Sequence, residues 1–170
     1  INRHEALRST FSSDGMSMII ATDLSIEVPC IDLSTVNEKQ RFQKIEDFIY
    51  EEAEFDFDLE HGPLARISVL KIIPDEHQLV LTFHHIVCDG WSLGIIMQDL
   101  GKMYSAFVTG SDYSDAPAIS FKDFALMEQQ YTGSDENLRI ENFWLNLYKN
   151  KLPAMEMQLD KSRPATRTYN

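Results

Sequence analysis

The chain has 170 residues, of which 44% are hydrophobic and 25% charged, and its formal net charge is −12. These totals predict one globular domain, and the acidic balance argues against nucleic acid or an anionic membrane as partner, since both need clustered Lys and Arg. No apolar run approaches the roughly 20 residues that a membrane-spanning helix needs.

The cysteines and the two ends of the chain give expectations about its setting. Cys30 and Cys88 are too few for a disulfide framework, so a reducing, cytoplasmic location is expected. The chain opens at Ile1, without Met and without the apolar stretch of a signal peptide. We therefore expect a segment of a longer protein.

The first third of the chain predicts a helix end, a hairpin and a long helix. Residues 1–7 have the pattern of a helix end, and strands at 8–11 and 16–22 flank an Asp-Gly turn. An extended piece and a loop follow at 24–35. Apolar residues then recur at helical spacing over 36–54.

The middle of the chain predicts two strands and a helix. A turn at 57–63 precedes strands at 64–73 and 77–84. The second strand is almost continuously apolar, which predicts burial on both faces. From Trp91 the period becomes helical, with Leu93, Ile96 and Leu100 among the residues on one face.

The last third predicts a polar loop at 109–117 and helices at 121–131 and 136–150. Ser134 or Asp135 is the expected N-cap of the second helix. Residues 153–170 have the pattern of an extended tail.

The segment from His84 to Gly90, HHIVCDG, joins the apolar strand to the helix and carries the chemistry. Alternation along a strand sends His84 and His85 to opposite faces, so one imidazole can face a cavity as a proton acceptor. Gly90 would allow a tight turn or a close approach of substrate. Free N–H groups of the following helix could stabilise an oxyanion, and a base beside such donors suits acyl transfer.

Each of these residues also has a structural interpretation. His84 is expected to be structural, and His85 by itself could be either a core histidine or a base. Asp89 is best explained locally as the N-cap of the helix. Cys88 has no activating neighbours and is expected to pack. No Cys/His cluster completes a metal site, so none is predicted.

Five segments of the chain carry a family resemblance: RHEALRSTF at 3–11, FDLEHGPLAR at 57–66, HHIVCDGWS at 84–92, FKDFA at 121–125, and FW through LP at 143–153 with DKSRP at 160–164. In this order they resemble the condensation domains of non-ribosomal peptide synthetases, specifically their N-terminal lobe. The chain departs from the family pattern at Ser9, which precedes Thr10, and at Met127, where Trp is common.

This resemblance implies a chloramphenicol-acetyltransferase-like lobe, an α/β (α+β sandwich) unit with a mixed sheet flanked by helices. The lobe is half of a V-shaped two-lobe condensation domain, with the reaction tunnel between the lobes. Residues 1–170 would then be a partial domain that lacks the opening strand and helix of the N-terminal lobe and the whole C-terminal lobe. The isolated fragment is expected to be inactive.

The resemblance also implies a reaction and a catalytic residue. His85 would deprotonate or orient the amine of an acceptor aminoacyl thioester, which attacks a donor acyl or peptidyl thioester to form a peptide bond. Asp89 would pair with Arg3, or alternatively with Arg8. Gly90 would leave room for the substrate arm.

Three residues are expected to support the site structurally: His84, Arg3 and Trp91. The substrates would arrive on the 4′-phosphopantetheine arms of an upstream donor and a downstream acceptor peptidyl carrier domain, beside an adenylation domain. The chain would need no cofactor of its own, no metal, no nucleic acid and no membrane.

Other members of the same fold remain as alternatives. Epimerization domains and other HHxxxDG acyltransferases share the motif, whereas heterocyclization domains carry two Asp in place of the His pair. A non-catalytic recruitment domain of the same fold is a different class. Such domains usually lose the second His or the Gly, but His85 and Gly90 are both present here.

Overall fold

The computed structural model describes residues 1–115, 118–150 and 166 of the chain. The chain divides into two units, Ile1–Phe124 and Ala125–Asn170, and each is described by itself. Among the described residues, no helix combines the length and the apolar character that crossing a membrane requires.

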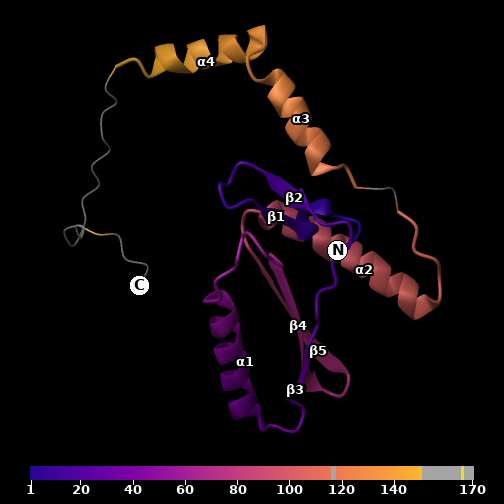
Figure 1. Cartoon of the computed structure of the whole chain (residues 1–170). Helices are drawn as coiled ribbons and strands as arrows, with labels where there is room; N and C mark the ends of the chain where they lie inside the picture. The colour runs from indigo at the N-terminus through magenta and orange to yellow at the C-terminus, as the bar shows by residue number, and fades with distance from the viewer. Residues whose placement is uncertain (116–117, 151–165, 167–170) are drawn as a thin grey trace. The chain divides into compact units, whose positions relative to one another are not determined.

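The first unit contains a mixed sheet of three strands, β3 (Cys30–Asp32), β4 (Ala65–Ile73) and β5 (Glu76–Phe83), in the order β3-β4-β5 (Figure 1). β3 runs parallel to β4, and β4 runs antiparallel to β5. Parallel strands need a crossover, which here is helix α1 (Glu38–Ala53). The predicted strands at 64–73 and 77–84 are confirmed, and the piece at 24–35 contains the short strand β3.

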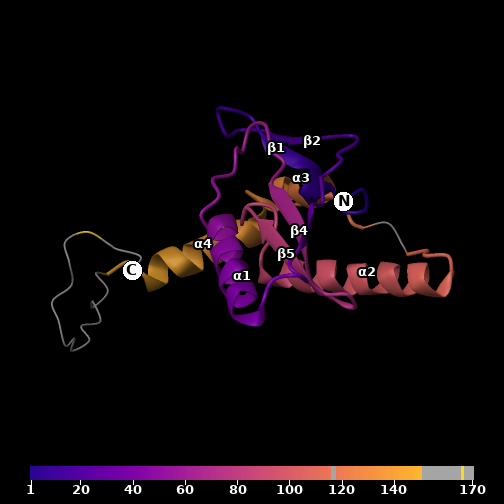
Figure 2. The same cartoon turned by 90° about the horizontal axis from the view of Figure 1, so that it is seen from below.

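Helices flank both faces of this sheet (Figures 1 and 2). Arg66 and Thr82 are paired across β4 and β5, and both side chains reach Glu52 of α1. The neighbouring pair, Ile67 and Leu81, faces the other way. These two residues line a cavity of about 350 Å³ together with residues of helix α2 (Gly90–Thr109).

Local capping explains where the helices begin and end. The Asn37 side chain accepts a hydrogen bond from the amide of Gln40 at 3.0 Å, which starts α1. Gly110, with φ at +66°, ends α2 in the left-handed conformation that glycine adopts at low cost. The predicted helices at 36–54 and from Trp91 are therefore confirmed to within two residues.

A two-stranded antiparallel sheet, β1 (Ser9–Phe11) and β2 (Met18–Ile20), lies near the N-terminus. Its turn is the predicted Asp-Gly turn: Gly15 has φ at +69°, and the Asp14 side chain accepts from the amide of Met16. A single 3-10 turn, η1 (Glu5–Arg8), precedes β1 where the end of a helix was expected.

Helix α3 (Phe121–Tyr131) spans the boundary between the units, and α4 (Asp135–Leu147) lies in the second unit. Ser134 caps α4 by accepting from the amide of Asn137, so both predicted helices are confirmed. The predicted extended tail at 153–170 lies outside the described residues except for position 166.

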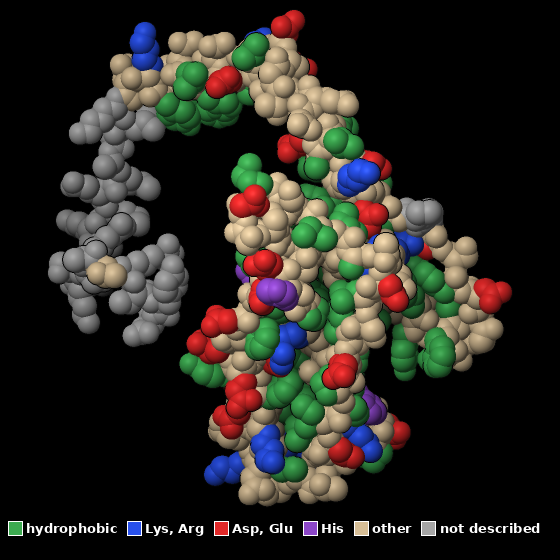
Figure 3. Space-filling view, in the orientation of Figure 1, with side chains coloured by type: hydrophobic (Ala, Val, Ile, Leu, Met, Phe, Trp, Pro, Cys, Tyr) green, Lys and Arg blue, Asp and Glu red, His purple; other side chains and the backbone are tan. Residues whose placement is uncertain are grey.

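The core of the first unit lies around β4, where Leu64, Ala65 and Leu70 are at most 1% exposed. The expectation that β5 is buried on both faces is wrong, because Leu79 is 37% exposed and its neighbours are half-buried. β5 is the last strand of the described sheet, and one of its faces borders the 350 Å³ cavity. Apolar side chains also lie among the charged ones on the molecular surface (Figure 3).

Candidate active site

The candidate site begins where β5 ends. The amide of His84 donates to the carbonyl of Leu64 at 3.0 Å, which extends the β4–β5 pairing by one residue. The amide of Val87 then donates to the carbonyl of His84 at 3.0 Å, so the chain turns immediately after the strand. α2 begins three residues later, which places the motif at the predicted strand-to-helix junction.

The two histidines lie in different surroundings, although both follow the end of β5 at Phe83 and His85 is part of a turn. His84 is half-buried, with its ring edge-on to Phe57 at 6.0 Å between centroids. Its Nδ1 accepts a hydrogen bond from the amide of Ile86 at 3.1 Å, so the imidazole holds the turn. His85 is exposed and lines a separate cavity.

This cavity, which we call the His85 pocket, measures about 440 Å³ and is walled by three stretches of the chain. One wall is the N-terminal segment, with Ala6, Phe11 and Met18. The second is the run from His85 to Ser92, and Phe121 at the start of α3 completes the lining. The walls of this pocket are mostly apolar. The ionisable residues that line it are His85, Cys88 and Asp89.

Asp89 is the N-cap of α2. Its Oδ1 accepts from the amide of Ser92 at 2.8 Å and from the Ser92 hydroxyl at 2.6 Å. These hydrogen bonds, with a smaller contribution from nearby His85, lower the pKa of the Asp89 carboxyl. The local interpretation of this residue as a helix cap is confirmed.

The expected pair between Asp89 and Arg3 is wrong. Arg3 instead forms ion pairs with Asp99 at 2.8 Å and Asp115 at 3.3 Å, and Arg8 donates to the backbone carbonyls of Ala21 and Asn2. The reason is geometric. Arg3 lies beside the middle of α2, and ten residues of helix place Asp99 about 15 Å from the N-cap.

The tight turn that was one alternative for Gly90, and the packing that was expected of Trp91, are not observed. Gly90 has no left-handed φ, and a Cβ added to it would meet no atom within 4 Å, so no tight turn requires glycine there. The space beside its Cα is open. Trp91 was expected to pack, but its side chain is 84% exposed.

Cys88 is buried at the edge of the pocket, and this burial, followed by the charge of Asp89, raises the pKa of its thiol. The prediction of a packing cysteine is consistent with that environment. Among the described residues, no group of three or more His, Cys, Asp or Glu could hold a metal ion.

Sequence reasoning missed a cluster in which the Asp99 carboxylate contacts both Arg3 and His4. Asp99 is 5% exposed, and its Oδ2 lies 2.7 Å from His4 Nε2. A signal was present: Asp99 is the acidic residue of α2, and it falls between Ile96 and Met103 at helical spacing on the apolar face.

The chemical capacity of the site is that of a base beside a helix N-terminus. The exposed imidazole of His85 can accept a proton inside a largely apolar pocket. Asp89 occupies the amide of Ser92, so the amides of Gly90 and Trp91 are the donors that the first turn can offer to an oxyanion. This arrangement suits acyl transfer to a nucleophile held in the pocket.

Comparison with known proteins identifies the family of the chain. The family described as Condensation domain matches residues 1–170. The dimodular nonribosomal peptide synthase of Bacillus subtilis (strain 168) is 35% identical over 99% of this chain, and tyrocidine synthase 3 of Brevibacillus parabrevis is 31% identical over 99%. The chain spans 7% and 2%, respectively, of the length of these relatives.

Solved structures give the same fold. The starter condensation domain of rhizomide synthetase RzmA aligns with a TM-score of 0.77 at 25% identity, covering 87% of this chain and 36% of that one. The epimerization domain from the third module of tyrocidine synthetase B aligns with a TM-score of 0.74 at 28% identity, covering 94% and 36%. The predicted α/β lobe with a mixed, helix-flanked sheet is confirmed, and the chain belongs to the condensation domain family.

Proposed function

We propose that this chain forms peptide bonds between carrier-bound substrates in non-ribosomal peptide synthesis, with His85 at the reacting centre. The observation that carries the proposal is the placement of His85: an exposed imidazole at the end of β5 that lines the His85 pocket. The amine nitrogen of the acceptor attacks the donor thioester carbon, the C–N bond forms and the C–S bond breaks. His85 accepts or orients the amine proton, and the thiol of the donor arm leaves with a proton.

The chain acts in this proposal as the N-terminal lobe of a two-lobe domain. Two observations support that role: the chain spans 36% of the rhizomide starter domain, and Trp91 and Phe107 are 84% and 85% exposed. Exposed apolar side chains recur along α2, at Leu93, Met97 and Tyr104 as well, and an extended exposed apolar surface is typical of a face that meets another part of a protein. The isolated fragment would be inactive, because the second wall of the tunnel is missing from it.

The proposed partners follow from the substrates. The donor and acceptor arrive on the phosphopantetheine arms of an upstream and a downstream peptidyl carrier domain, with an adenylation domain in the same cytoplasmic megasynthase. The chain contributes no cofactor of its own. Catalysis would rest on positioning two tethered reactants, on the His85 imidazole and on the first-turn amides of α2.

Epimerization is the second candidate. The observation that favours it is the likeness to the tyrocidine epimerization domain, at 28% identity. In that reaction a base would remove the Cα proton of one carrier-bound aminoacyl group and return a proton to the other face. The same histidine could serve either reaction, so condensation and epimerization must be distinguished by their products.

The test uses the complete protein that carries this chain, together with its neighbouring carriers. The upstream carrier is loaded with a Cα-deuterated donor and the downstream carrier with an acceptor, both chosen by the neighbouring adenylation domains. Intact-protein mass spectrometry then follows each carrier. Condensation moves the donor mass to the acceptor arm with deuterium retained. Epimerization loses deuterium without moving mass, and a recruitment domain does neither.

A further inference from the structure

The Asp99 cluster joins the N-terminal segment to α2. Asp99 Oδ2 lies 2.8 Å from Arg3 Nε and 2.7 Å from His4 Nε2, and the Asp99 side chain is only 7% exposed. A carboxylate this buried is costly unless it is paired, and here one oxygen receives a hydrogen bond from the His4 imidazole and an ion pair from the Arg3 guanidinium. The cluster therefore fixes the start of the chain against the middle of the helix.

The position of the cluster relates it to the His85 pocket. His4 lies two residues before Ala6, the first wall residue of the pocket, and the same segment continues to Phe11 and Met18. The opposite wall belongs to the start of α2, where Ser92 lies seven residues, or about 10 Å, before Asp99. Helix α2 thus contributes to one wall of the His85 pocket, and it also binds the N-terminal segment that forms the other wall.

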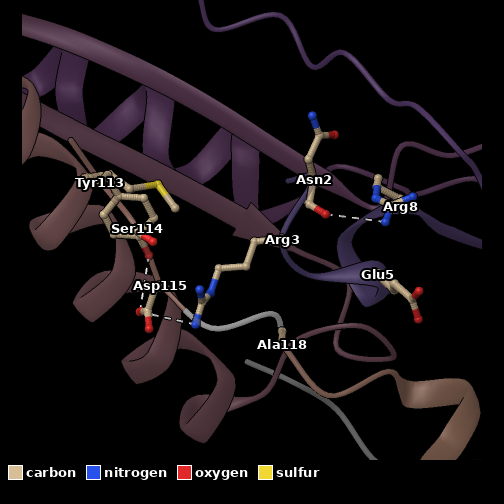
Figure 4. A pocket seen from close by; sticks show the side chains of 9 residues that line it. Asn2, Arg3, Glu5, Arg8, Tyr113, Ser114, Asp115 and Ala118 are labelled. Carbon is tan, nitrogen blue, oxygen red and sulfur yellow. Dashed lines mark hydrogen bonds and ion pairs between the residues drawn. The ribbon is translucent and has the colours of Figure 1, made fainter.

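Arg3 strengthens this attachment. Its guanidinium reaches between the N-terminal segment and Asp115, which follows α2, and forms a second ion pair there at 3.3 Å (Figure 4). Lys102 of α2 contacts the same Asp115 carboxylate at 3.2 Å. Arg3 is therefore tied to the helix directly through Asp99 and again through Asp115.

Other polar contacts of the N-terminal segment lie within it or lead to parts of the chain other than α2, such as the hydrogen bond from the Phe11 amide to the carbonyl of Leu59. The Ser9 hydroxyl donates to the carbonyl of Glu5, and Arg8 donates to the carbonyl of Ala21. Ser120, beside α3, donates to the Glu5 carboxylate at 2.6 Å. The polar contacts from this segment to α2 itself, among the described residues, converge on Asp99.

We propose that Asp99 is a positioning residue for the reaction at His85: by holding Arg3 and His4 on α2, it sets the distance between the two walls of the His85 pocket. Its relevance to catalysis rests on the function proposed above, whereas its effect on the pocket does not. Asp99 does not contact the pocket, so it acts through the wall residues Ala6 and Phe11.

Cys88 offers a readout of the pocket that is independent of activity. Cys88 lines the pocket and is 8% exposed as a residue, whereas Cys30 on β3 is exposed. If the N-terminal wall moves away from α2, Cys88 becomes accessible while Cys30 does not change. The complete protein is alkylated with iodoacetamide, and peptide mass spectrometry follows each cysteine. The measured quantity is the ratio of Cys88 alkylation to Cys30 alkylation.

Asp99→Asn removes the charge and keeps the side-chain shape. We expect Cys88 alkylation relative to Cys30 to rise about tenfold and kcat/KM for condensation to fall by a similar factor, since an opened wall no longer positions the acceptor. Glu52→Gln is the matched control. Glu52 is 6% exposed and paired with Arg66, but it lies between α1 and the sheet, away from the pocket.

The two variants are compared at temperatures equally far below their own Tm values, where both are folded. Selective exposure of Cys88 in Asp99→Asn, without it in Glu52→Gln, supports the proposal. Equal Cys88 exposure in both variants, or none in either, would overturn it. If Asp99→Asn does not fold, His4→Ala replaces it in the test. This variant removes one contact and leaves Asp99 paired with Arg3, and it should also raise Cys88 alkylation relative to Cys30. If Cys88 is selectively exposed in Asp99→Asn but the wild-type protein forms no condensed product, the positioning role of Asp99 at the pocket stands and only the proposed function is contradicted.

Discussion

Asp89 holds the amide and the hydroxyl of Ser92 with one carboxylate oxygen, at 2.8 and 2.6 Å. The acidic residue of the HHIVCDG segment therefore closes the first turn of α2 beside the His85 pocket. The loop from His84 to Gly90 is stabilised locally, without the distant arginine that the family resemblance implied.

This capping role predicts which substitutions of Asp89 are tolerated. Asp89→Asn keeps an acceptor oxygen for Ser92 and should leave the Tm of the complete protein nearly unchanged, because Asn caps helices about as well as Asp. Asp89→Ala should lower the Tm, since the Ser92 amide loses its partner. A melting curve for each variant checks this. If Asn and Ala are equally damaging, the charge and not the cap is what matters.

Gly90→Ala separates function from stability. A Cβ at position 90 meets no described atom within 4 Å, and Ala favours a helix by up to about 1 kcal/mol over Gly. The free energy of unfolding should therefore hold or rise, while condensation falls at least about tenfold because the methyl group occupies space proposed for substrate. Gly94→Ala, also in α2 and equally unobstructed, is the control and should keep its activity. Full activity in Gly90→Ala would contradict the proposed substrate path.

Gly62 is required by the fold itself. Its φ is +61°, and a Cβ would lie 2.9 Å from Cγ2 of Thr10 on β1. Gly62→Ala should destabilise the protein by about 2 kcal/mol, from the left-handed backbone plus the collision. Gly15→Ala, at φ +69° with open space, meets only the backbone cost of about 1 kcal/mol. Urea unfolding of both variants measures the difference, and equal losses would mean that Thr10 moves aside freely.

The Glu52–Arg66 pair predicts a pH dependence of stability. Hydrogen bonds from Arg66 hold the pKa of the Glu52 carboxyl below its usual 4.5, and they outweigh the effect of burial. A lowered folded-state pKa means that the stabilisation is complete above about pH 4.5 and is lost as the pH falls through the folded value.

Glu52→Gln should cost about 2 kcal/mol at neutral pH and flatten the loss of stability below pH 4.5. The cost is smaller than for a fully buried pair because the Arg66 side chain is 39% exposed. Urea unfolding from pH 7 to pH 3 measures both effects. An unchanged slope with acid would show that Glu52 does not carry this dependence.

Much of the fold could be predicted because its signals are local. Asp14-Gly15 marks the β1–β2 turn, and the change from near-continuous apolar residues in β5 to helical spacing after Trp91 locates the strand-to-helix junction. The cap of Asp89 was also readable, since an Asp directly before a helix and Ser three residues later are adjacent in space.

The errors concern contacts between distant parts of the chain. Which carboxylate pairs with Arg3 depends on where the N-terminal segment meets α2, and no local pattern distinguishes position 89 from position 99. The burial of β5 and of Trp91 depends on neighbours outside their own elements, so hydrophobicity alone overestimated it. The family resemblance carried the identity of His85 as the candidate base, which periodicity could not supply.

The central claim is that the His85 imidazole serves peptide-bond formation, and one comparison tests it most directly. In the complete protein with both carriers loaded, the condensed product on the acceptor arm is followed by intact-protein mass spectrometry for wild type, His85→Ala and His77→Ala. His77, an exposed histidine of β5 away from the pocket, is the control. We predict normal product from wild type and His77→Ala, and a loss of at least about a hundredfold for folded His85→Ala. Product formed by His85→Ala at the wild-type rate would contradict the account.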